Sequence, residues 1–225
     1  MRPSTEAELA EAVAGATGPL LLRGGGTRTL GPAVGEVLET GGLSGVELYE
    51  PGALTLVVRA GTPLAEVEAV LAAERQRLAF EVPDMRGLLG REWVSTVGGV
   101  VAANASGPRR VQVGACRDAC LGVRFVDGTG MVVTNGGRVM KNVTGYDLVK
   151  LLAGSRGVLG VLTEVSLKVQ ALPEAEATLV IEGLDDAAGL TALRAALGAP
   201  FDISGAARHS GRSLVRVEGM AGSVA

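Results

Sequence analysis

Residues 5–14 repeat apolar side chains at the spacing of an amphipathic helix. Leu9 and Val13 fall on one face of this helix, and glutamates occupy the opposite face. Ser4 or Thr5 can cap its first turn. This pattern predicts a surface helix that packs on a sheet.

Residues 64–73 show the same helical spacing, and Pro63 suits the start of that helix. Shorter apolar runs separated by Gly, Pro and Asp predict strands joined by tight turns. The loop 83–93 contains the single tryptophan, Trp93, which we expect to cover part of the core. The predicted strands cover 19–22, 46–48, 54–58, 78–80, 121–126, 131–133 and 165–169, and a further helix covers 148–153.

The pattern changes at Pro173. From there a strand, a helix over 187–197 and two more strands predict the start of a separate β-α-β-β unit. Such a half-unit leaves a sheet edge exposed, so two alternatives stand: an interface with a partner or a second copy, or a disordered tail.

The segment Ser95–Gly107 is built almost entirely from small residues. Large side chains would bury more area, so a run of glycine and alanine suits a place where the backbone approaches another group closely. Ser95 or Thr96 can cap a short helix whose first N–H groups then face outward, as at anion sites. Two alternatives stand here: a bound anionic cofactor, or a small-residue helix buried beneath a sheet.

A second glycine-rich loop, residues 23–29, follows directly after a predicted strand. Its three consecutive glycines expose backbone N–H groups, and Arg23 and Arg28 stand beside them, which favours a phosphate site over a plain hairpin turn. The dinucleotide pattern G-x-G-x-x-G fails because Thr29 replaces its third glycine, and no phosphate-binding P-loop motif occurs.

Composition narrows the classes of partner. With a net charge of −3 and no basic stripe, the chain is a poor match for nucleic acid. Only six aromatic residues occur in 225, so Val, Leu and Ala must form the core, and 34 glycines imply many tight turns.

No apolar run is long enough to cross a membrane, and the N-terminal residues do not resemble a signal peptide. The two cysteines, Cys116 and Cys120, are too few for a disulfide framework or a metal cluster. We therefore expect reduced thiols, no metal, and a cytoplasmic protein that could reach a membrane through partners.

Five motifs in order carry a family resemblance: RGGGT (23–27), AGTPLAEV (60–67), STVGGVVAANASG (95–107), LGVRFVDGTGMVV (121–133) and the run 141–169. Together they resemble the PCMH-type flavin-binding domain of the vanillyl-alcohol-oxidase superfamily, most of all its glycolate oxidase subunits of the E type. The resemblance covers residues 1–172. It implies an α+β fold with two α+β subdomains that hold FAD between them, and residues 173–225 would be a truncated α/β cap domain.

The resemblance also implies positions for the cofactor. The glycine loop would hold the diphosphate, the segment from Ser95 would approach the phosphates and the flavin ring, and the segment 157–162 would face the adenine and ribose. The implied cofactor-binding residues are Arg23, Gly24, Gly25, Gly26, Thr27 and Arg28, then Ser95, Thr96, Gly98, Gly99 and Asn104, then Gly157, Gly160, Val161 and Leu162.

The sequence departs from the family pattern in three places. Arg156 stands where the catalytic relatives carry a glutamate. No His or Cys precedes Cys116, so we expect the FAD to be bound non-covalently. The cap would be short, and the only histidine, His209, lies within it.

Oxidation of a 2-hydroxy acid needs a cation for the carboxylate and a base for the hydroxyl proton. Candidate cations are Arg109, Arg110, Arg138 and Lys141, and His209 is the candidate base. Two functions remain open at this stage. The chain is either an FAD-binding subunit of a glycolate or 2-hydroxy-acid oxidase, working with a catalytic paralogue and an iron–sulfur subunit, or a non-catalytic assembly subunit that has lost flavin or turnover.

Overall fold

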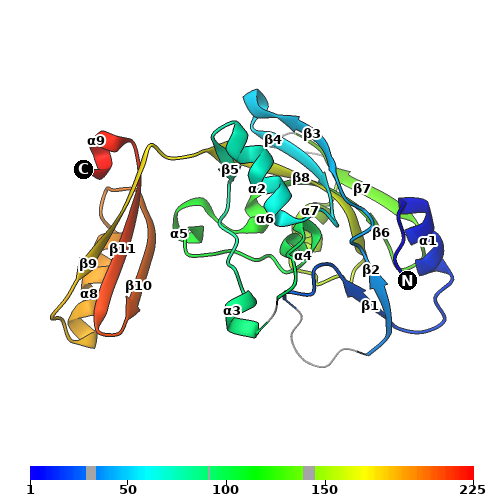
Figure 1. The fold of residues 1–225 in the computed structure, drawn as a ribbon, viewed down its shortest axis with the longest axis horizontal. Helices are drawn as coiled ribbons and strands as arrows, with labels where there is room; N and C mark the ends of the chain where they lie inside the picture. Colours follow the sequence, from blue (N-terminus) through cyan, green and yellow to red (C-terminus); the bar gives the residue numbers. More distant parts are fainter. Residues whose placement is uncertain (29–33, 91, 139–144) are drawn as a thin grey trace.

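Three sheets organise the chain. The computed structural model describes residues 1–28, 34–90, 92–138 and 145–225. Its sheets are a parallel pair near the N-terminus, a six-stranded antiparallel sheet in the middle and a three-stranded antiparallel sheet at the C-terminus. The first two sheets form one body, and the third stands beside it (Figure 1).

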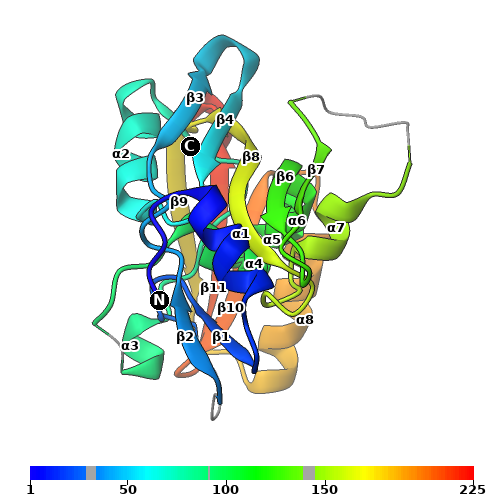
Figure 2. The same ribbon diagram turned by 90° about the vertical axis from the view of Figure 1, so that its right-hand side faces the viewer.

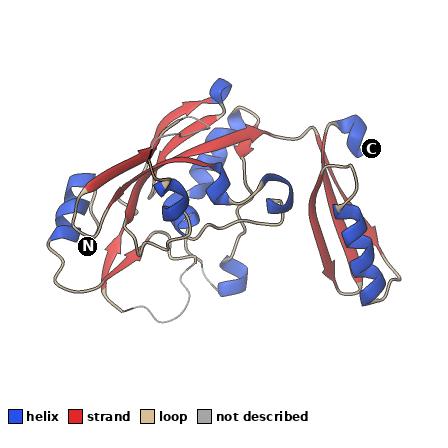
Figure 3. Ribbon diagram, turned by 180° about the vertical axis from the view of Figure 1, so that it is seen from behind, coloured by secondary structure: helices blue, strands red, loops and turns tan. Residues whose placement is uncertain are grey.

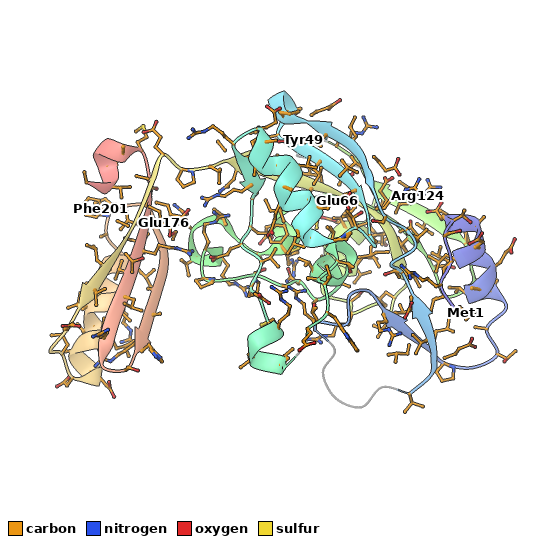
Figure 4. All side chains as sticks on the ribbon, viewed as in Figure 1. Met1, Tyr49, Glu66, Arg124, Glu176 and Phe201 are labelled. Atoms are coloured by element: carbon orange, nitrogen blue, oxygen red, sulfur yellow. The ribbon has the colours of Figure 1, made fainter. Side chains whose placement is uncertain are left out.

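The N-terminal part consists of helix α1 (Glu6–Ala14) and the paired strands β1 (Leu20–Arg23) and β2 (Glu36–Glu39). Thr5 caps α1, as predicted, because its side chain accepts a hydrogen bond from the Glu8 N–H. Arg124, labelled in Figure 4, donates to both carboxylate oxygens of Glu6, at 2.7 and 2.6 Å, and so fixes α1 against the central sheet.

The central sheet has the strand order β3-β4-β8-β6-β7, and β5 pairs with the far end of β8. The predicted hairpins around residues 51–53 and 127–130 are both present, the first closed by a short 3-10 turn (Pro51–Ala53). The strands are β3 (Val46–Glu50), β4 (Thr55–Arg59), β5 (Gln76–Leu78), β6 (Cys120–Val126), β7 (Val132–Gly136) and β8 (Val161–Ala171).

Four helices share one core with this sheet: α2 (Leu64–Ala73), α4 (Val97–Ala102), α6 (Cys116–Ala119) and α7 (Leu148–Leu152). Strands β4, β6 and β8 supply the sheet's share of that core, which Val and Leu dominate as composition predicted. Asp147 caps α7 through a hydrogen bond from the Lys150 N–H. In the view of Figure 2, α2 lies to the left of β8, and α6 and α7 lie to its right.

Two single-turn helices lie in the connections, α3 (Arg86–Leu89) and α5 (Arg110–Val113). The first falls in the segment predicted as a plain loop, so that prediction was incomplete. None of the helices in the described ranges is long and apolar enough to cross a membrane.

The C-terminal unit contains β9 (Ala175–Ile181), α8 (Asp186–Leu197), β10 (Ile203–His209) and β11 (Arg212–Gly219), followed by α9 (Ala221–Val224). This is the predicted β-α-β-β order. The strands run β10-β11-β9, with α8 against one face (Figure 3).

Ion pairs connect this unit to the body. Arg77 of β5 donates to Glu218 of β11 (Nη2–Oε2 2.5 Å), and Arg216 of β11 donates to both oxygens of Glu81, at 2.8 and 3.0 Å. Arg109 lies beside them and is 4% exposed. A cavity of about 330 Å³ lies among these charges, and Glu176, labelled in Figure 4, also lines it.

Candidate functional site

The glycine loop meets the start of α4 at the side chain of Thr96. Thr96 Oγ1 accepts hydrogen bonds from the N–H of Gly99, at 3.4 Å, and from the N–H of Gly25, at 3.3 Å. The first bond is the predicted helix cap, and the second joins two motifs that lie 71 residues apart in the chain. One hydroxyl group therefore sets the position of both segments.

The third predicted segment packs against the other end of α4. The N–H groups of Gly154 and Arg156 donate to the carbonyls of Val101 and Ala102, at 3.0 and 2.8 Å. Gly157 follows with φ +83°, and a Cβ there would strike Leu22 of β1. The turn after α7 is thus held between α4 and the N-terminal pair of strands.

Two adjoining cavities lie where these three segments meet, with volumes of about 240 and 90 Å³. They share Leu22, Gly24, Gly99, Ala102 and Arg156 in their walls. The larger is lined also by Leu21, Arg23, Gly25, Gly26, Thr27, Arg28, Thr96 and Ala103, and the smaller by Thr40, Ala60, Gly98, Gly157, Gly160, Val161 and Leu162.

The charged side chains that line these two cavities are Arg23, Arg28 and Arg156; none of the described lining residues is acidic. Arg23 pairs with Glu39 of β2 and lies over the Trp93 ring, with its guanidinium carbon 5.8 Å from the ring centroid. Arg28 donates to Ser95 and to the Pro83 carbonyl, the latter at 3.0 Å. Burial lowers the pKa of Arg28, but arginine keeps its proton at neutral pH. The site is built to hold an anion.

Residues 1–136 match the family model described as "FAD binding domain". The chain belongs to this FAD-binding family. FAD is therefore its cofactor, and the predicted α+β fold of the PCMH type is confirmed.

Curated relatives include the glycolate oxidase subunit GlcE of Escherichia coli K12, which is 40% identical over 92% of this chain and 57% of its own length. The glycolate oxidase subunit GlcD of Bacillus subtilis 168 is 32% identical over 76% of this chain and 36% of its own length. D-lactate dehydrogenase of Archaeoglobus fulgidus is 34% identical over 67% of this chain and 33% of its own length. The chain thus spans between a third and somewhat more than half of these relatives.

Among solved structures, an alkyldihydroxyacetonephosphate synthase superposes with a TM-score of 0.79 at 19% identity, over all of this chain and 47% of the synthase. At that identity the likeness shows a shared fold. It places the C-terminal unit as well as the FAD-binding body within that fold.

The residues of the two cavities fit a diphosphate-bearing cofactor. Within the described ranges, the N–H groups of Gly24, Gly26 and Thr27 donate to no backbone or side-chain acceptor. The Nε of Arg28 is buried and likewise unpartnered among the described residues. Unsatisfied donors beside a cationic wall are the groups that phosphate oxygens satisfy.

The start of α4 corrects one expectation. Its first N–H groups do not face outward, because each already has an acceptor. The N–H groups of Val97 and Gly98 donate to the carbonyls of Thr62 and Ala60, at 3.0 and 2.7 Å. The N–H of Gly99 donates to the Thr96 hydroxyl. Helix α4 lines the two cavities with small side chains, and the unpaired donors among the described residues come from the glycine loop instead.

Trp93 corrects a second expectation. It is 50% exposed rather than buried in the core. Its ring packs against the backbone of Gly26, which has φ +65° and where a Cβ would strike the ring. Trp93 therefore shapes the outside of the glycine loop.

The remaining predicted residues lie apart from the two cavities. Ser95 lines a neighbouring cavity of about 170 Å³, which also includes Thr27 and Arg28. Asn104 turns the chain after α4 with φ +46°, and its side chain accepts a hydrogen bond from the Arg117 N–H.

Both thiols, Cys116 and Cys120, are buried and free, as predicted.

The candidate substrate residues are scattered. Arg109 is a buried partner of Glu218, so the expectation that it is a surface cation is wrong. Arg110 begins α5, Arg138 is exposed, His209 ends β10 in the C-terminal unit, and Lys141 lies outside the described residues.

Sequence reasoning missed several wall residues, including Leu21, Thr40, Ala102 and Ala103. Nothing in the residue types of Leu21 and Thr40 signals a site, whereas Ala102 and Ala103 belong to the small-residue segment 95–107 that was predicted to approach a cofactor. Arg156 was noticed only as a departure from the family pattern, yet it lines both cavities.

Proposed function

We propose that this chain is the FAD-binding subunit of a 2-hydroxy-acid dehydrogenase of the glycolate oxidase type. The named relatives act on glycolate or D-lactate, which are both 2-hydroxy acids. The observation that carries the proposal is the meeting of three separate segments at two adjoining cavities with a wholly cationic set of charges.

In this proposal Arg23 to Arg28 hold the diphosphate through the loop N–H groups and the Arg28 guanidinium. Thr96 and Gly99 form the wall beside it, and the segment 157–162 holds the adenosine side. No His or Cys occurs among the described residues that line the two cavities, which supports non-covalent attachment.

When bound, FAD supplies the acceptor for the hydride that leaves the substrate carbon. None of the described residues lining the two cavities can take the hydroxyl proton, and His209 lies on the C-terminal unit. We therefore assign this chain the holding of FAD, and we assign substrate turnover to a complex with a catalytic flavoprotein paralogue and an iron–sulfur subunit. The free thiols Cys116 and Cys120 support a cytoplasmic location.

The test is reconstitution of the purified chain with FAD, followed by glycolate-dependent reduction of a dye. We expect flavin absorbance bands that survive gel filtration, and dye reduction only when the paralogue and the iron–sulfur subunit are added. Rapid turnover by the chain alone would contradict the division of labour, and failure to take up FAD would contradict the assigned site.

The lack of a base in the described cavity walls also favours a second candidate, a non-catalytic assembly subunit. The same reconstitution separates the two. A complex whose turnover survives removal of FAD from this subunit alone, through a site variant, would identify the assembly role.

A further inference from the structure

Arg156 stands where the two cavities join. It lines both of them, its side chain is exposed, and its guanidinium makes no hydrogen bond or ion pair with any described residue. The two other cations of the site are already engaged, Arg23 with Glu39 and Arg28 with Ser95 and Pro83.

The backbone of Arg156 is held in place although its side chain is exposed. Its N–H donates to the Ala102 carbonyl at the end of α4, and its φ is +55°, a left-handed conformation that disfavours residues with a Cβ. Such conformations persist where the surrounding structure enforces them, and they gather at ligand sites.

Charge balance indicates what this side chain meets. The diphosphate of FAD carries two negative charges, and no acidic side chain of the described cavity walls opposes them. Glu39 neutralises Arg23, so Arg28 and Arg156 supply the two uncompensated positive charges. Arginine binds phosphate oxygens through paired donors, which suits this task.

We propose that Arg156 binds the diphosphate of FAD from the side opposite the glycine loop, and that it sets the site's preference for a phosphorylated flavin over riboflavin. This inference rests on the proposed FAD site. It assigns a cofactor contact to a residue that differs in charge from the glutamate expected at this position.

The test measures Kd for FAD and for riboflavin by titration of the apoprotein, with quenching of the single tryptophan as the signal. At low salt, R156A should weaken FAD binding about tenfold and R156E about a hundredfold, whereas R156K keeps the charge but not the paired donors and should fall between the wild type and R156A. Riboflavin affinity should not change, and added salt should weaken FAD binding less in R156A than in the wild type. R194A, which removes an exposed arginine of α8, is the matched control.

A further variant separates binding from folding. R156G removes the cation and also relieves the left-handed conformation, so the melting temperature of the apoprotein should rise while FAD affinity falls as in R156A. Equal loss of riboflavin and FAD affinity in R156E, or wild-type FAD affinity in R156A and R156E, would overturn the role of Arg156. A wild-type chain that binds no FAD would overturn the assigned site itself.

Discussion

Arginines gather at two places in this molecule, and their surroundings are opposite. At the proposed FAD site, Arg23, Arg28 and Arg156 line two cavities whose described walls contain no acidic residue. At the contact with the C-terminal unit, Arg77, Arg109 and Arg216 line a larger cavity together with glutamates. In the first set, Arg28 and Arg156 have no carboxylate partner among the described residues, whereas every arginine of the second set has one.

The second set is satisfied from within the chain. Glu218 is 3% exposed, and its carboxylate lies within 3.5 Å of all three guanidinium groups. Glu81 accepts hydrogen bonds from both terminal nitrogens of Arg216. Burial raises the pKa of Glu218, but hydrogen bonds and the positive charges of Arg77 and Arg109 outweigh burial and leave that pKa below its usual value. Both sets contain three arginines, so arginine content does not separate them, and cavity size alone would favour the cavity at the C-terminal unit. The acidic residues in the wall distinguish a structural cluster from a binding site.

Removal of Glu218 should give the largest effect and test this distinction directly. E218A leaves Arg109 charged, buried and without its carboxylate partner. We therefore expect the free energy of unfolding, measured in urea, to fall by about 3–5 kcal/mol. E182A, which removes the exposed Arg212–Glu182 pair of the same unit, should cost less than about 0.5 kcal/mol. Similar losses for the two variants would show that the buried cluster does not hold the units together.

Adjacent glycines of α4 should separate folding from FAD binding. A Cβ on Gly98 would lie 2.7 Å from the Ala60 Cβ and 2.8 Å from its carbonyl oxygen, so G98V should destabilise the fold by about 1–3 kcal/mol. A Cβ on Gly99 would meet only the Thr96 hydroxyl, at 3.2 Å, and Gly99 lines both cavities. G99V should therefore destabilise the fold less than G98V and lose about 10- to 100-fold in FAD affinity.

G99A, with a single added methyl group, serves as the graded control for G99V. Unchanged FAD affinity in G99V would move the cofactor away from α4.

Local sequence signals predicted most elements of the fold. Helix α2 has the predicted bounds because Pro63 starts it and its apolar spacing persists to Leu71. Thr96 was a predicted cap because a hydroxyl before a small-residue run suits that role. Short-range periodicity and capping chemistry are properties of the segment itself, so the sequence carries them.

The site was less predictable because it depends on contacts between segments. The N–H groups of Val97 and Gly98 look available in the sequence, and only the approach of Ala60 and Thr62 removes them. Arg109 looked like a surface cation until β11 brought Glu218 to it. Residue type indicated which groups could bind an anion, whereas tertiary packing determined which ones remain unpaired.

Low pH should weaken the charged cluster between the two units, and the stability contributed by the Glu81 carboxylate should fall with it. The hydrogen bond from Arg216 holds the pKa of Glu81 below its usual value, against the effect of burial. A carboxylate with a lowered pKa stabilises the fold above its unfolded pKa, near 4.3, and loses that contribution as pH falls through the folded value. E81Q should therefore cost about 1–2 kcal/mol at pH 7, and the gap to the wild type should close as the pH falls toward 3.

Glu68 of α2 lines the same cavity, and partial burial raises its pKa. It is the control because its pKa shift is opposite in direction to that of Glu81. Its ionised form opposes folding once the pH exceeds the unfolded pKa, so E68Q should be neutral or slightly stabilising at pH 7. Melting curves of the wild type, E81Q and E68Q between pH 3 and 7 measure the difference in stability between each variant and the wild type. A gap for E81Q that stays constant down to pH 3 would mean that its carboxylate is not tuned by Arg216, and the contrast between satisfied and open arginines would then rest on Glu218 alone.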